Sequence, residues 1–251
     1  MDAVIIGKLL GFAMVMTRIS AFFLVAPIFG TPSIPQTMKV SAIVLLSVFF
    51  SLINPPVAAA QQASAIQAML LLGSEATYGL ALGVITGVLF ATVQLAGRIA
   101  EDQMGLTMAE MLDPLTGEQS LPIATLLELV FTIAFLAANG HHLLLKVMHH
   151  SFELFPAGQI PSIATLTGNI YEATTMMLTA ALQLAAPILA ALLVLLVILA
   201  LLAKVVPEME IFFISFPLRI AVGLIMLIAM MPFIDDFVSE TAKMMAKILP
   251  L

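Results

Sequence analysis

Four histidines lie close together in the middle of the chain and are the first candidates for chemistry. They are His141, His142, His149 and His150, and imidazole is a frequent ligand of zinc. No H-E-x-x-H pattern occurs, and Lys146 places a cation inside the group, which opposes the binding of a metal ion. We therefore expect a polar, amphipathic helix here and no metal site.

The other polar residues form no pattern that is typical of a catalytic site. The sequence has no Cys, no G-x-S-x-G turn and no glycine-rich phosphate loop. Asp235 and Asp236 are adjacent, so on a helix their side chains would point about 100° apart. We expect no enzymatic activity and no cofactor.

Two arginines, Arg18 and Arg219, lie inside long apolar stretches. A lone charge that faces lipid costs at least ~2.5–3.5 kcal/mol. We expect both residues to be buried charges that face protein or a water-filled path, each with an acceptor nearby.

Gly79, Gly83 and Gly87 recur every four residues and would share one face of a helix. Small residues at this spacing allow another backbone to approach closely. The face is a predicted helix-packing interface, either with another helix of the chain or with another subunit.

The composition shows what these residues are embedded in. Of the 251 residues 62% are apolar and only 10% are charged, whereas soluble domains have about 25% charged residues. The net charge is −6 and no run of basic residues occurs, so nucleic acid is not an expected partner. The sequence predicts an all-α, polytopic membrane protein in contact with lipid, formed by a single domain that covers residues 1–251.

Apolar runs and the prolines, glycines and polar residues between them predict six to seven long helices in kinked hairpins. The expected ranges are Val4–Ala26, Val40–Ile53, Gln67–Ile99, Pro122–Ala138, Leu166–Val206, Ile211–Met230 and a terminal Phe233–Leu249. A His-rich piece up to Phe155 follows the fourth of these. Their lengths fit a bilayer poorly. Residues Ala173–Ala203 carry no charge over 31 positions, or about 46 Å of helix, whereas the hydrocarbon core is about 30 Å thick. Tilt and re-entrant hairpins, or neighbouring subunits in place of lipid, would explain the misfit.

The most polar segment, Arg98–Gln119, separates two strongly apolar helices. It holds five acidic residues, and Gly105 and Asp113-Pro114 should interrupt a helix there. Taken alone, the segment would be a connecting loop.

Four stretches, in order along the chain, resemble one known family. They are Gln103–Leu106 followed by Asp113-Pro114, Asn139–His142, Ser151-Phe152 with Phe155–Gly158, and Phe216–Leu224 followed by Met231-Pro232. In this set the chain resembles the FliR/SpaR/HrcT family of type III secretion export-gate subunits, over essentially its whole length. The Asn-Gly-His-His stretch is more similar to the flagellar branch than to the injectisome branch.

The resemblance implies a non-enzymatic subunit of the export gate in the bacterial inner membrane, at the flagellar basal body. In that family the subunit assembles with FliP and FliQ into a helical hetero-oligomer around a pore, near FlhA and FlhB, and unfolded flagellar proteins pass through it. It also implies a pore plug between Gly105 and Gln119. The residues that would form this plug are Gly105, Leu106, Thr107, Met108, Met111, Leu112, Asp113 and Pro114. Some relatives have phenylalanine where this chain has Met108 and Met111, so contacts specific to aromatic rings do not carry over.

Two alternatives remain at this point. One is an injectisome export-gate subunit. The other is an ion-coupled secondary transporter, which would use Arg18 or Arg219 with an acidic partner near the midplane. The absence of an inverted repeat disfavours the transporter.

Overall fold

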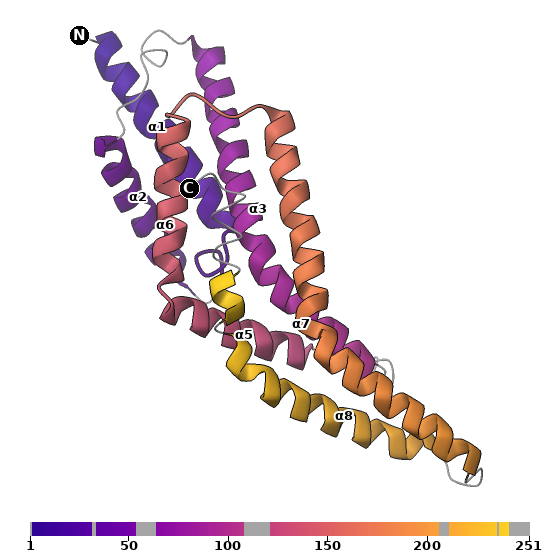
Figure 1. The fold of residues 1–251 in the computed structure, drawn as a ribbon. Helices are drawn as coiled ribbons and strands as arrows, with labels where there is room; N and C mark the ends of the chain where they lie inside the picture. The colour runs from indigo at the N-terminus through magenta and orange to yellow at the C-terminus, as the bar shows by residue number, and fades with distance from the viewer. Residues whose placement is uncertain are drawn as a thin grey trace, which may run out of the picture. The chain divides into compact units, whose positions relative to one another are not determined.

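The structure is a computed structural model, and it describes residues 2–31, 34–53, 64–107, 121–205, 211–234 and 236–240. Within these ranges the regular structure is helical and contains no strand (Figure 1). The predicted all-α class is therefore confirmed. The helices, with one short 3₁₀ helix (η2), are α1 (Asp2–Val25), α2 (Gln36–Ile53), α3 (Ala65–Met104), α5 (Pro122–Ala137), α6 (Gly140–Leu154), α7 (Ile163–Val205), α8 (Ile211–Met230) and η2 (Met231–Phe233).

Five helical segments are long and apolar enough to cross a membrane, among the residues that the structure describes. They are Ile6–Val25, Gln36–Ile53, Ala65–Met104, Ile163–Val205 and Ile214–Phe233. A sixth crossing is possible if α5 and α6 form one broken span, since the two helices meet at a bend of 72°. The bend lies at Asn139, whose φ of 59° is left-handed and cannot continue a helix.

Two helix boundaries differ from the expected ones by more than three residues, and the expected range Phe233–Leu249 lies partly outside the described residues. Helix α2 begins at Gln36 rather than Val40, because the amides of Met38 and Lys39 bond to the carbonyl of Pro35 and start the helix directly after the proline. Helix α3 continues to Met104 rather than Ile99 and so includes the first part of the polar segment. It stops where Gly105 adopts a φ of 83°, as glycine often does just past a helix end.

The helices group into two compact units. Unit 1 contains residues up to 89 and residues 139–175, and unit 2 contains residues 90–138 and 176–240. The core of unit 1 includes the buried side chains Met14, Phe22, Leu144, Met148 and Phe152. In unit 2, Phe90 of α3 makes edge-to-face contacts with Phe131 and Phe135 of α5, with ring centroids 5.2 and 5.4 Å apart.

Candidate functional site

A fully buried ion pair joins α1 to α3 in unit 1. Nε of Arg18 lies 2.6 Å from Oε2 of Glu75, and Nη2 donates to Oε1 at 3.0 Å. Both side chains have an exposed fraction of 0%. The two parallel hydrogen bonds give the bidentate arrangement in which guanidinium and carboxylate interact most strongly.

The remaining donors of Arg18 reach the end of α6 and the turn that follows it. Nη1 donates to the carbonyls of Ser151 at 3.0 Å and Phe155 at 2.9 Å, and Nη2 is 3.4 Å from the carbonyl of Gln159. Carbonyls in the last turn of a helix have no partner within the helix, and they carry its negative dipole end. The carbonyl of Ser151 also accepts a hydrogen bond from the amide of Phe155 at 3.1 Å, and the guanidinium supplies further donors at this negative end of the helix.

Groups on either side complete the site. The amide of Gly158 donates to Oε1 of Glu75 at 2.7 Å. The guanidinium carbon lies 4.7 Å from the ring centre of Tyr78 and 4.3 Å from that of Phe152, within the range of cation–π attraction. Every direction around the pair is thus taken by protein, which suits a structural clamp rather than a site for a substrate or a coupling ion.

Sequence reasoning singled out Arg18 but missed Glu75. A signal was available, since Glu75 is the only acidic residue between Asp2 and Glu101. A lone acid in an apolar stretch needs a partner as much as a lone arginine does.

The glycine face of α3 packs against α1 of the same chain. A Cβ on Gly79 would lie 2.3 Å from the carbonyl oxygen of Arg18, and one on Gly83 would lie 3.0 Å from Cβ of Val25. At Gly87 the nearest atom would be 3.8 Å away, an ordinary contact. Helix α3 therefore approaches α1 most closely at Gly79 and Gly83, within unit 1.

Arg219 lies on α8 in unit 2 and is partly exposed. Its neighbours on the same helix face, Phe216 and Gly223, pack against the end of α3 at Gly105 and Met104. In the portion of the chain that the structure describes, no hydrogen bond or ion pair is seen for Arg219.

The structure describes three of the eight residues that are predicted to form a plug. Gly105 is buried and ends α3, and Leu106 and Thr107 follow it with partly exposed side chains. Met108, Met111, Leu112, Asp113 and Pro114 lie outside the described residues.

The polar face of α6 carries the histidines. His149 and His150 both approach Glu153, with N···O distances of 3.5 and 2.9 Å. Across the described ranges, no group of three or more residues has the types and geometry to hold a metal ion.

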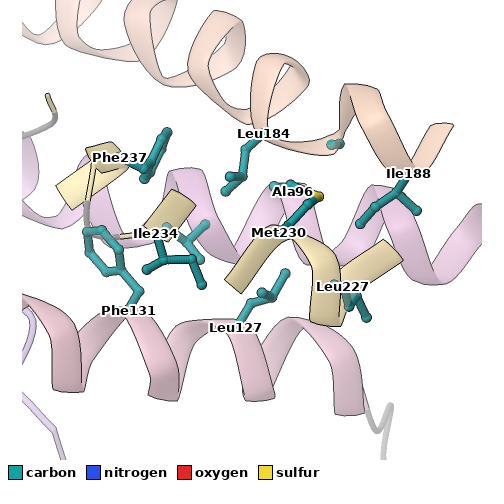
Figure 2. A pocket seen from close by; sticks show the side chains of 11 residues that line it. Ala96, Leu127, Phe131, Leu184, Ile188, Leu227, Met230, Ile234 and Phe237 are labelled. Atoms are coloured by element: carbon teal, nitrogen blue, oxygen red, sulfur yellow. The ribbon is translucent and has the colours of Figure 1, made fainter. Parts of the chain in front are cut away.

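A cavity lies inside unit 2, where α3, α5, α7 and α8 converge (Figure 2). It is lined only by apolar side chains: Val93, Ala96, Leu127, Phe131, Leu184, Ala185, Ile188, Leu227, Met230, Ile234 and Phe237. Since no polar group points into it, the cavity offers nothing to orient a polar ligand or to hold water. We interpret it as a packing void.

We predict that Glu75→Gln destabilises the protein strongly. The change leaves Arg18 buried without a compensating charge, and breaking a buried ion pair in this way costs ~3–5 kcal/mol. Thermal unfolding of the purified protein in detergent, with its partners if it needs them, would measure the loss. Glu153→Gln, at a half-exposed carboxylate, is the control. Equal melting temperatures for the two variants would show that the pair is not a structural clamp.

We also predict a graded effect of alanine along the glycine face. Gly79→Ala should lower thermal stability most, because its Cβ meets backbone of α1, and Gly83→Ala should lower it less. Gly73→Ala, in the same helix but with nothing within 4 Å of its Cβ, should be neutral or stabilising, since alanine favours helix by up to ~1 kcal/mol over glycine. A flat series across the three variants would contradict the observed packing.

Comparison with known proteins identifies the family to which the chain belongs. The family model described as bacterial export proteins, family 1, matches residues 9–245. The flagellar biosynthetic protein FliR of Bacillus subtilis is 35% identical over 225 residues, which cover 88% of this chain and 85% of that protein. FliR of Escherichia coli is 29% identical, over 88% of this chain and 84% of its own length. The Yop proteins translocation protein T of Yersinia pestis is 26% identical, over 88% and 85%. The chain belongs to the family of bacterial export proteins, family 1.

Proposed function

We propose that this chain is a structural and pore-forming subunit of the flagellar type III secretion export gate in the bacterial inner membrane. The observation that carries the proposal is the 35% identity to a flagellar FliR over 88% of the chain. The identity to the Yop proteins translocation protein T, on which the injectisome alternative rests, is lower, at 26%. The flagellar branch is therefore favoured, and the whole chain would act as one export-gate domain.

The exposed surface of α7 supports an assembly with other apolar proteins. This helix has 43 residues, or about 65 Å at 1.5 Å per residue, roughly twice the thickness of a hydrocarbon core. Large apolar side chains are exposed over much of its length, among them Leu178, Leu182, Leu193, Leu201 and Val205. A bilayer cannot cover so long an apolar helix unless it is strongly tilted. We propose that FliP and FliQ cover it in a hetero-oligomer, with FlhA and FlhB nearby.

The buried ion pair disfavours the transporter alternative. A coupling ion needs an acidic residue with a free coordination position near the middle of the membrane. Glu75 instead accepts hydrogen bonds from Arg18 and Gly158 and is fully buried. A static partner for an arginine suits a scaffold protein better than an ion carrier.

We further propose that the segment from Gly105 to Gln119 is the pore plug. A pore wide enough for an unfolded protein must be closed at rest, and apolar constrictions close pores by excluding water. Met108, Met111 and Leu112 supply apolar side chains, and methionine can pack against surfaces of varied shape. The sealing residues would thus tolerate the passage of flagellar proteins of many sequences.

We predict that deletion of residues 106–112 makes the assembled gate leak ions or small solutes while partner binding survives. Conductance or swelling measurements on cells that express the complex would detect the leak. Replacement of the same seven residues by a Gly/Ser stretch of equal length should also leak, because the apolar seal is lost. Met108→Leu with Met111→Leu should stay closed. An unchanged leak in the deletion variant, with the complex intact, would show that the plug lies elsewhere.

A further inference from the structure

A second buried charge, Glu101, lies one turn before the end of α3. Its exposed fraction is 1%. Oε1 accepts hydrogen bonds from the backbone amides of Ile123 and Ala124, the latter at 3.3 Å. These amides belong to the first turn of α5, where backbone donors have no partner within the helix and the dipole favours an anion. A residue of α3 therefore caps α5.

Gly97 provides a second contact between the same two helices, one turn earlier on the same face of α3. A Cβ at this position would lie 2.5 Å from Cα of Ala124 and 3.0 Å from its backbone nitrogen. Only glycine allows the backbone of α3 to come this close to the start of α5. The contact is independent of the charge on Glu101.

The last turn of α3 is also fixed from another side. Met104 is fully buried, and its side chain occupies the space left open by Gly223 of α8, where a Cβ would lie 2.6 Å from its sulfur. The ring of Phe216 lies 3.6 Å from the position that a Cβ on Gly105 would take. The start of α5 and the end of α3 are therefore both held within unit 2.

We propose that Glu101 is a positioning residue that ties the end of α3 to the start of α5 and so fixes where the chain from 105 to 121 leaves and returns. This proposal rests on the proposed function, since that stretch contains the plug segment. Five acidic residues lie between positions 98 and 119. Glu101 differs from an acidic residue of a solvated loop, because its carboxylate is buried and holds two helices together.

The absence of native Cys allows a direct test. Spin labels on Thr107→Cys and Leu121→Cys in the assembled complex report the distance between the two ends by pulsed electron paramagnetic resonance. We expect a narrow distribution with Glu101 present and a distribution at least twofold broader in Glu101→Ala. Glu101→Gln, which keeps an oxygen acceptor, should fall between the two. Asp102→Ala is the matched control, since it removes the neighbouring, exposed carboxylate and should leave the distribution unchanged.

The leak measurement separates this proposal from the plug itself. If Glu101→Ala raises the leak severalfold toward that of the 106–112 deletion and Asp102→Ala does not, both proposals are supported. If the deletion leaks but Glu101→Ala matches Asp102→Ala in distance and leak, the role of Glu101 is refuted and the plug stands. If the deletion does not leak but Glu101→Ala broadens the distances, the plug is refuted and the positioning role stands. Should Glu101→Ala fail to assemble, Glu101→Gln gives the same test, because it removes the charge and keeps the size of the side chain; a distribution as narrow as that with Glu101 present would refute the proposal.

Discussion

Burying a full positive charge inside an apolar protein requires that every donor of that charge finds an acceptor. Arg18 meets this requirement with one carboxylate and three backbone carbonyls. The acceptors come from α3, the end of α6 and the turn after it, so these segments must stay in place for the charge to be tolerated. The packing of Gly79 on the carbonyl of Arg18 brings the two helices close enough for the pair to form. Unit 1 is in this way organised around one electrostatic constraint.

The buried charges of Glu101 and Arg18 each stabilise one end of a helix, the start of α5 and the end of α6 respectively. Helix ends leave backbone groups without partners, and an apolar environment offers no water to replace them. Glu101 accepts amides at the start of α5, and Arg18 donates to carbonyls at the end of α6. In each case the sign of the side-chain charge matches the helix dipole. A chain with so few charged residues thus places two of them where irregular backbone must be stabilised.

The long helices were predictable from the sequence because hydrophobicity is a local property. Runs of apolar residues ended by Pro, Gly or Asn gave α5 and α8 to within one residue. The same pattern predicts an end of α3 at Ile99, five residues before the observed end at Met104, because acidic residues are usually a sign of solvent-exposed loops. Glu101 is instead buried, and its partners are amides that lie 22 and 23 positions further along the chain. No pattern in the neighbouring sequence predicts a hydrogen-bond partner that lies so far along the chain.

The sequence by itself determined that the protein is a helical membrane protein, the order of its helices and its family. It also determined that an arginine is buried in the first helix. All of these follow from residue types and their spacing. Only the tertiary structure decided which groups neutralise that arginine. Glu75 lies 57 positions away, and the carbonyls of Ser151 and Phe155 lie 133 and 137 positions away. Backbone carbonyls are common to every residue, so their use as acceptors depends on where helices end in space, which is a property of the packed fold and not of any segment alone.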